Sequence, residues 1–505
     1  MPGGPLNARL GNLALEMLAK IGTLEAYGAL SNITAKASYS VYKRAIESCR
    51  KKFTRLLEQY SPEELADRSA PGHGIEEGKL RIAVEDWHAI LSLDGLKVQA
   101  NWEAPGGKLQ KAAPAALKKQ AAAALKAVKA EEKSIAETLQ AQSRRLERSW
   151  LLQRSWALGD WKAYIAGHPL MSCLAERLIW MAEDWPVSFI LSSGQMADAR
   201  QAPVYLPDAT RIRLWHPAIA TVAETLAWRD FIFAQQLTQP FKQAFREVYM
   251  LTPAEELAGD HSKRFAGHYL RGNTLYSLGK SREWLMSYDQ PPLFRVPGGQ
   301  YTAMLNIRGG VLYSECITQE LCFFADTSSN TNLAGNNKRV RLSDIPPVIL
   351  SEVMRDIDLF ISVASLGLDP LFDQKQTGDL MDYWRDASFG SKSRTPLADV
   401  RRDLLQRLLP MTKIARKCSF EGNYLKVVGS LRTYKINLGS GNILMEPNGQ
   451  YLCIVPGTGG KPPQSIWLPF EGGDETLMAI LSKAFLLAED EKITARDILV
   501  QIMRE

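Results

Sequence analysis

The stretch Leu431–Pro456 reads LRTYKINLGSGNILMEPNGQYLCIVP and alternates apolar with polar residues around two turn signals. Asn448-Gly449 is a strong hairpin signal, because this dipeptide tolerates the positive φ of a tight turn. A phosphate-binding loop needs its glycines between a strand and a helix, so that helical N–H groups meet the phosphate. Here a strand follows Gly441. The stretch therefore predicts an antiparallel β meander, with Gly439–Asn442 as one of its turns.

A second interpretation of this turn stays open. A glycine-rich flap between strands covers the ATP phosphates in kinases, but it requires a downstream lysine, a catalytic aspartate and a metal-binding aspartate. The residues after Gly441 contain no such set, which excludes a kinase. A flap over another anion remains, with Arg432 and Lys435 as clamps. The residues of this possible nucleotide turn are Gly439, Ser440, Gly441 and Asn442.

The residues around the turn extend the meander in both directions. We expect strands at 424–428, 431–438, 442–445 and 451–455. Two helices, at 474–488 and 494–503, are predicted to close the chain.

Positive charge is concentrated in and before the meander. The chain has a net charge of +6, but Lys392–Lys435 contains eleven basic and three acidic residues, or +8, so the other residues sum to −2. Neighbouring cations can neutralise several phosphates of a nucleic acid, and Tyr424 and Tyr434 could stack on bases. The alternative is a solvated surface, or pairing with acidic residues elsewhere in the fold. The candidate binding residues are Arg401, Arg402, Arg407, Lys413, Arg416, Lys417, Arg432 and Lys435.

Composition is that of an ordinary globular protein, with 46% apolar, 23% charged and 9% aromatic residues. No apolar run reaches the length of a membrane helix, and the first residues lack the features of a secretory signal, so we expect a cytoplasmic protein with no membrane partner. The six cysteines and six histidines are dispersed, without CxxC, HExxH or GxSxG motifs. We therefore assign no metal, no cofactor and no catalytic residue.

The rest of the chain is expected to be largely helical. Residues 7 to about 70 carry apolar residues at helical spacing, and Ser61 and Glu64 have the spacing of a capping box. Asp94-Gly95 predicts a hairpin. Residues from Pro114 to about 156 predict one long amphipathic helix or a hairpin of two.

Residues 156 to 290 are predicted to continue as helices, with starts at Pro169 and Pro240. In the second of these, Phe241, Phe245 and Val248 form an apolar stripe; the polar residues Lys242, Gln243, Arg246 and Glu247 fall on the other side. Thr252 caps the next helix, and Gly309-Gly310 predicts a hairpin within 293–325.

The fold class expected from these patterns is α+β and predominantly helical. The predicted domains are a helical-array remnant (1–72), a β-hairpin with a long amphipathic helix (73–156), a central helical domain with a β-hairpin (157–345) and a C-terminal meander domain (346–505).

Two further groups of residues are secondary site candidates. His168 and His216 each precede a proline, and either act as acid/base or ligand residues or cap and pack at helix starts. Arg264, His268 and Arg271 are spaced for one face of a helix, where they would form an anion pocket or an interdomain salt-bridge face.

Long motifs of this chain resemble a bacterial family named after the molybdate metabolism regulator (MolR), whose long members often carry a WGR domain. The similar stretches include SDIPPVILSEVMRDIDLFISVASLGLDP from Ser343, TPLADVRRDLLQRLLPMTKIARKCSFEGNYLKVVGS from Thr395 and HPLMSCLAERLIW from His168. The resemblance implies a regulatory or conflict-associated protein preceded by HEAT-like helical repeats. It supplies no established catalytic residue, and this sequence shows no WGR domain.

Two functional hypotheses follow. The first is a non-enzymatic regulatory or scaffold protein, in a bacterial regulatory or defence context, whose basic segment binds nucleic acid or an acidic partner. The second is an enzyme or sensor that holds a nucleotide or anion under the Gly439–Asn442 turn.

Overall fold

The computed structural model describes most of the 505-residue chain. The described residues are 7–36, 40–192, 194–287, 290–310, 315–325, 339–368, 395–454, 466–472 and 474–503. Close contacts divide the chain into two units. The first consists of Met1–Ser149, Arg154–Trp215 and Leu237–Phe241, and the second of Trp150–Gln153, His216–Gln236 and Lys242–Glu505. The finer division into four domains stays a prediction.

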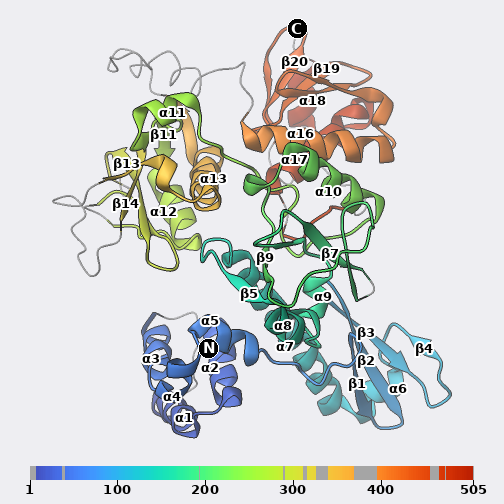
Figure 1. Cartoon of the computed structure of the whole chain (residues 1–505). Helices are drawn as coiled ribbons and strands as arrows, with labels where there is room; N and C mark the ends of the chain where they lie inside the picture. The colour runs from blue at the N-terminus through green and yellow to red at the C-terminus, as the bar shows by residue number, and fades with distance from the viewer. Residues whose placement is uncertain are drawn as a thin grey trace. The chain divides into compact units, whose positions relative to one another are not determined.

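The first unit begins with helices packed around their own apolar core (Figure 1). These helices are α1 (Ala8–Ile21), α2 (Leu24–Lys36), α3 (Ser40–Arg50), α4 (Thr54–Gln59) and α5 (Pro62–Arg68). Tyr27 and Phe53 meet edge to face in this core, with 5.4 Å between their ring centroids. The predicted capping box of α5 is confirmed, because Ser61 and Glu64 each accept a hydrogen bond from the other's backbone N–H.

An antiparallel meander follows the helices, and a long helix follows the meander. The strands of the meander, in pairing order, are β1 (Lys79–Val84), β2 (Trp87–Asp94), β3 (Lys97–Glu103) and β4 (Leu109–Gln110). Asp94 pairs with Lys97 across the predicted hairpin turn, and Gly95 has the expected positive φ of 61°. Most of the amphipathic stretch forms one long helix, α7 (Ala122–Arg148), as the first of the two predicted alternatives has it, and a short helix, α6 (Ala115–Gln120), precedes it.

Residues 155–214 form a second sheet, so the expectation of continued helix is wrong here. Its strand order is β5-β9-β6-β7-β8. The strands are β5 (Ser155–Ala157), β6 (Trp180–Ala182), β7 (Ser188–Ser192), β8 (Gln195–Ala197) and β9 (Arg211–Leu214), and the helical segments between β5 and β6 are α8 (Leu158–Trp161), η1 (Lys162–Ala166) and α9 (Ser172–Ala175). The apolar residues of β7 occur in a continuous buried run rather than at helical spacing, as in strands covered on both faces.

The second unit contains a sheet of order β12-β13-β14-β11-β16, in which β10 and β15 also pair with β14 (Figure 1). The strands are β10 (His261–Ser262), β11 (His268–Arg271), β12 (Leu293–Arg295), β13 (Tyr301–Arg308), β14 (Glu315–Ala325), β15 (Arg339–Val340) and β16 (Ser365–Leu368). The predicted hairpin about Gly309 is confirmed by the antiparallel pairing of β13 with β14.

This part of the unit also contains the helical segments η2 (Pro217–Ile219), α10 (Val222–Ala234), α11 (Pro253–Ala258), α12 (Gly272–Ser281), η3 (Leu342–Asp344) and α13 (Pro347–Ala364). Of these, α12 and α13 pack on β11 of the sheet, and α11 lies beside β10. Thr252 and Glu255 form the predicted capping box of α11. In contrast, no helix begins at Pro240, and residues 239–252 run without helical structure.

The C-terminal part of the second unit is the meander predicted from Leu431–Pro456. Its strands, in order, are β17 (Cys418–Glu421), β18 (Tyr424–Val428), β19 (Thr433–Asn437), β20 (Ile443–Glu446) and β21 (Tyr451–Leu452). The four predicted strands are confirmed, whereas β17 was missed. The helical segments here are α16 (Pro396–Leu408), η4 (Leu409–Met411), η5 (Ala415–Lys417), α17 (Glu475–Ala488), η6 (Asp490–Lys492) and α18 (Arg496–Ile502).

The α+β class is confirmed by these helices and antiparallel sheets. The predicted predominance of helix is not confirmed, because residues 155–214 and 261–325 contribute strands to two sheets. The helix α17 packs on β18 and β19. This arrangement places the Gly439–Asn442 turn, between β19 and β20, beside the start of that helix.

Candidate functional site

The turn between β19 and β20 uses all of its N–H groups internally. The Asn437 side-chain oxygen accepts from the N–H groups of Gly439 and Ser440, at 2.9 and 3.0 Å. The Asn437 carbonyl accepts from Gly441 N–H at 2.8 Å, and the Ser440 hydroxyl accepts from Asn442 N–H at 3.3 Å. A phosphate cradle needs such donors free. The meander interpretation of this turn therefore fits the geometry, and the nucleotide-turn alternative lacks its donors.

Carbonyl oxygens of the same turn face cationic side chains. Arg401 Nη1 donates to the carbonyls of Leu438 and Gly439, at 3.1 and 2.6 Å. Lys483 Nζ on α17 donates to the Gly441 carbonyl at 2.6 Å. These cations fasten the turn to α16 and α17, which is a structural use of charge.

A true anion cradle occurs at the preceding turn, and the chain fills it with its own carboxylate. The Asp490 side chain is buried and accepts from the N–H groups of Ser430, Leu431 and Arg432, at 2.7 to 3.1 Å. The Tyr434 hydroxyl donates to the same carboxylate at 2.9 Å. Burial alone would raise the pKa of Asp490, but these donors hold it below its usual value. The carboxylate is thus ionised and occupies the position that a bound anion would take.

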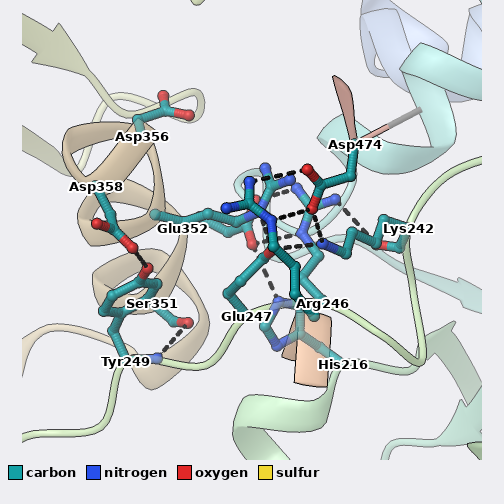
Figure 2. A network of polar contacts seen from close by, with 12 residues as sticks. His216, Lys242, Arg246, Glu247, Tyr249, Ser351, Glu352, Asp356, Asp358 and Asp474 are labelled. Carbon is teal, nitrogen blue, oxygen red and sulfur yellow. Dashed lines mark hydrogen bonds and ion pairs between the residues drawn. The ribbon is translucent and has the colours of Figure 1, made fainter. Parts of the chain in front are cut away.

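A cluster of buried charges in the second unit joins segments that are far apart in sequence (Figure 2). The non-helical segment after Pro240 supplies its centre, and the start of η2, α13, α16 and the start of α17 supply the rest. We call it the central ion network; its members are His216, Lys242, Arg246, Glu247, Glu352, Arg355, Arg401 and Asp474. The expectation that the polar residues of this segment face away from the core is wrong, because long-range ion pairs stabilise them inside it.

One end of the network is built around Glu352. Arg246 binds this carboxylate through both Nε, at 2.7 Å, and Nη2, and its guanidinium lies 4.6 Å from the Trp150 ring centroid. His216 Nδ1 accepts from Ala218 N–H at 3.0 Å, so its proton is on Nε2, which contacts Glu352 Oε1 at 3.2 Å. Burial lowers the pKa of His216, which keeps the ring neutral at pH 7. This histidine is a fixed hydrogen-bond donor rather than a proton shuttle.

Lys242 forms the centre of the network. Its ammonium group contacts Glu247 closely and lies 3.4 Å from Asp474 Oδ2. Arg355 Nε donates to the other Glu247 oxygen at 2.8 Å. Burial alone would raise the pKa of Glu247, but Lys242 and Arg355 hold it far below its usual value. Both oxygens of this carboxylate are therefore committed to cations of the same chain.

Asp474 forms the other end of the central ion network. Arg401 binds it in a bidentate way, with Nε–Oδ2 and Nη2–Oδ1 distances of 2.8 Å each. The same carboxylate caps α17 by accepting from Leu477 N–H at 2.9 Å. Burial opposes its ionisation, but Lys242 and then Arg401 hold its pKa below the usual value. Asp474 thus links the C-terminal helix to the cations of the network.

Two neighbouring carboxylates of α13 have different environments. Asp358 accepts from the Tyr249 hydroxyl, and burial raises the pKa of Asp358 to about 6. Asp356 accepts from Arg282 Nε at 2.8 Å and from the Trp284 indole at 3.0 Å. Ser351 of α13 accepts from the Tyr249 N–H at 3.1 Å and so holds the backbone of the non-helical segment after Pro240. Figure 2 shows Asp358 and Ser351 turned toward Tyr249, whereas Asp356 points away from them.

The side chains of the central ion network are poorly suited to catalysis. Every carboxylate of the central ion network accepts from at least two donors. Arg246 and Arg401 each bind a carboxylate through Nε and Nη2 and donate from Nη1 to a backbone carbonyl. A general base or nucleophile needs an accessible group with a poised pKa, whereas burial and ion pairing fix these groups in one protonation state. Within the described ranges, no group of three or more His, Cys, Asp and Glu residues could hold a metal ion.

The predicted basic segment does not form one open cationic surface. Lys392 and Arg394, at its start, lie outside the described residues. Four candidates form ion pairs: Arg401 with Asp474, Arg407 with Asp230 and Asp403, Lys413 with Glu489, and Lys435 with Glu421 and Glu446. Three donate to backbone carbonyls: Arg402 to Gly422, Lys417 to Ala488 and Arg432 to Ile502. Of the eight, Arg416 is exposed and has no partner among the described residues.

The secondary candidates also have structural roles. His168 caps a turn by accepting from the N–H groups of Leu170 and Met171, at 3.1 Å each. Arg264, His268 and Arg271 do not share a helical face, because residues 268–271 form β11. Arg264 binds the buried Glu255, and burial lowers the pKa of His268 to about 4. The structure therefore does not bring these residues together as an anion pocket.

Sequence reasoning missed the central ion network. Its members come from five segments of the chain. His216 and Arg401 were candidates in the sequence, but as an acid/base or ligand residue and as part of a basic surface, not as members of a buried network. Most of its pairs join residues at least 73 positions apart, and such pairing carries no signal in one sequence.

Comparisons with known proteins give no activity. A family model described as a domain of unknown function (DUF4132) matches residues 107–284, and another, also described as a domain of unknown function (DUF7737), matches residues 398–502. The chain is 22% identical over 224 residues to "Uncharacterized protein YehI" from Escherichia coli (strain K12).

This similarity is partial on both sides. It covers 43% of this chain and 18% of the E. coli protein, so the chain matches less than a fifth of its relative. No solved structure matches the chain. Among the described residues, no helix combines the length and apolar content needed to cross a membrane.

Proposed function

We propose that this chain is a non-enzymatic regulatory or scaffold protein that acts by binding a protein partner. The observation that carries the proposal is the mutual saturation of the central ion network. Its carboxylates and cations neutralise each other inside the second unit, so they stabilise a fold and offer no reacting group. A buried charge that is fully paired is a structural element, and breaking such a pair is strongly destabilising.

The bacterial regulatory or defence context belongs to the same proposal. It rests on the resemblance to the MolR family and on the similarity to an E. coli protein, whose name states no activity. Binding of nucleic acid or an acidic partner by the basic segment is a second candidate function, opposed to this proposal. It would depend on Arg416, which is exposed, and on Lys413, whose side chain pairs with Glu489 but is 59% exposed, because the other candidate cations are less accessible.

Ligand titrations test the proposal directly. We expect no thermal stabilisation by ATP, GTP or NAD, since a ligand that binds the folded state raises its melting temperature. We also expect no saturable binding of duplex DNA, single-stranded DNA or RNA, even at low salt, where phosphate contacts are strongest.

Two results would overturn it. Stabilisation by a nucleotide that is lost in the Gly441→Val and Lys435→Ala variants would establish the anion-binding turn. Duplex binding with a steep salt dependence, weakened by Lys413→Glu and Arg416→Glu, would return the basic segment to nucleic-acid recognition. Both exposed cations can be replaced without unpairing a buried carboxylate, unlike Arg401.

A further inference from the structure

The helix α1 carries an apolar stripe that nothing in the described chain covers. Leu10, Leu13, Met17 and Ile21 are 65%, 52%, 57% and 59% exposed. Their spacing of three, four and four residues places them on one face of a helix. Single exposed apolar residues are normal on a protein surface, but a contiguous stripe of them marks an interaction site.

The opposite side of α1 is already buried. Leu15 is 4% exposed and belongs to the core of the α1–α5 bundle, and its carbonyl accepts from the Cys49 thiol at 3.0 Å. The helix therefore has one apolar side for its own bundle and a second apolar side without a partner. Amphipathic helices with a single apolar side need only one partner.

The ends of α1 are complete without a partner. Asn7 caps its start by accepting from the N–H groups of Arg9 and Leu10, at 2.9 and 3.3 Å. Gly22 ends it in the left-handed conformation, with a φ of 66°. The stripe is thus held on a preformed helix, which lowers the entropy cost of binding.

We infer that this stripe docks an amphipathic helix of a partner protein, in helix-against-helix packing. The inference rests on the proposed scaffold function and names the place and class of the partner. The stripe extends from Leu10 to Ile21, or about 17 Å of helix axis, which matches three turns of a second helix.

The size of the stripe favours a helix over a second copy of the chain. Four side chains of this exposure provide roughly 400 Å² of apolar surface, about half of what each partner contributes to a stable interface. A helix that packs along the stripe can use this area fully, in the manner of a helix-in-groove complex.

Charge next to the stripe also opposes self-pairing. Arg9, Glu16 and Lys20 are exposed along one side of it. In an antiparallel pair with Leu10 opposite Ile21, a two-fold axis brings this side against itself. Glu16 then faces Glu16 of the other copy, and Arg9 faces Lys20, which is unfavourable. A parallel pair leaves these charges without counter-charges, because the other side of the stripe carries Asn7 and Gly11.

The partner chemistry follows from the same residues. Its helix carries Leu, Ile or Met at three- and four-residue spacing. Beside that stripe it carries an acidic residue opposite Arg9, a basic residue opposite Glu16 and an acidic residue opposite Lys20. Opposite charges in these places select the partner and its orientation.

Fluorescence anisotropy with designed peptides tests the inference on the full chain. The matched probe is a labelled helical peptide with this stripe and acidic, basic and acidic flanking residues. One comparison peptide has the three flanking charges reversed, and another has the same composition in scrambled order. We expect the matched peptide to bind, the charge-reversed peptide to bind about tenfold more weakly at low salt, and the scrambled peptide not to bind.

Variants of the chain locate the site. Leu13→Glu together with Met17→Glu is expected to weaken binding about 100-fold, because two buried contacts become charged. The pair Leu13→Met and Met17→Leu should retain binding. Leu257→Glu on α11, at a position that is 77% exposed, is the matched control and should change nothing. All these positions are exposed, so unchanged thermal melting confirms that the variants fold.

Three outcomes would refute the inference: equal binding of matched and scrambled peptides, no binding of the matched peptide, or binding that survives Leu13→Glu with Met17→Glu. Self-association in sedimentation that this double variant abolishes would show instead that a second copy covers the stripe. These outcomes leave the nucleotide and nucleic-acid titrations unaffected, so failure of the docking site and failure of the scaffold function are distinguishable.

Discussion

Asp474→Asn is the sharpest perturbation of the central ion network. The asparagine keeps the size of the side chain and still caps α17, because Asn and Asp are equally good N-caps. It removes only the negative charge that Arg401 binds through two 2.8 Å contacts and that Lys242 approaches at 3.4 Å. Any loss of stability in this variant therefore reports the charge and not the cap.

The expected magnitude follows from burial. Arg401 and Asp474 have side chains that are only 4% and 7% exposed, so solvent cannot replace the lost carboxylate. Removing one partner of a buried ion pair costs about 3 to 5 kcal/mol. Lys242 keeps Glu247, so we expect the lower limit, about 3 kcal/mol for Asp474→Asn. Asp474→Ala should cost about 1 kcal/mol more, because the cap is also lost.

Native-state hydrogen exchange is the suitable assay, because a chain of two units does not unfold in one two-state step. Amides of α17, at residues 475–488, report the opening free energy of this part of the fold. Glu446→Gln serves as the control, since Glu446 pairs with lysines at the surface and should leave α17 protection unchanged.

A double-mutant cycle with Arg401→Met completes the test. We expect a coupling energy of about 2 kcal/mol between Arg401 and Asp474, in the range found for residues in one ion network. If Asp474→Asn changes the opening free energy of α17 by less than about 0.5 kcal/mol, the range of ordinary surface substitutions, the network does not stabilise this unit and the reasoning fails.

Three further changes test separate parts of the second unit. Burial raises the pKa of Asp358 to about 6, so folded chains hold a proton that unfolded chains release above about pH 4; this group therefore makes unit stability fall by about 3 kcal/mol between pH 4 and pH 7, and pH-dependent unfolding of Asp358→Asn should lack that fall. Gly429→Ala places a Cβ 2.2 Å from Asp490 Oδ2, so we expect at least about 2 kcal/mol of destabilisation by chemical unfolding, and a neutral result would contradict the cradle geometry. Gly441 has a φ of 72°, and Gly441→Ala should cost about 1 kcal/mol in the same measurement while leaving nucleotide response unchanged.

The sequence predicted those parts of the fold in which neighbouring residues decide the structure. Turn dipeptides such as Asp94-Gly95 and Asn448-Gly449 fix the φ of a hairpin locally, and a capping box needs only residues three apart. The meander strands and the two final helices were therefore predicted closely. β17 was missed because its short stretch, Cys418–Glu421, alternates over only four residues.

Prediction failed where distant contacts decide the structure. Phe241, Phe245 and Val248 have helical spacing, but the charged residues between them find partners on α13 and at the cap of α17, and the segment runs without helix. The eight basic candidates likewise cluster in sequence, whereas their partners come from as far away as Asp230 and Ile502. Charge density along a chain does not reveal whether the chain also supplies the counter-charges.

The central ion network also has a consequence for how the two matched regions relate. Lys242, Arg246 and Glu247 lie within the first matched region, Arg401 and Asp474 lie within the second, and Glu352 and Arg355 come from α13, which neither family model covers.

A fragment that ends at residue 284 would keep Lys242 with Glu247 but would leave Arg246 without Glu352, and a fragment of residues 398–502 would keep Arg401 with Asp474 but lose Lys242. Each separation exposes or unpairs charges whose burial is favourable only when they are matched. Within the second unit, the two regions and the helix between them are therefore parts of one folded body. Lys242 and Asp474 join the two matched regions directly, and α13 joins the first region through the pairs Arg246–Glu352 and Arg355–Glu247.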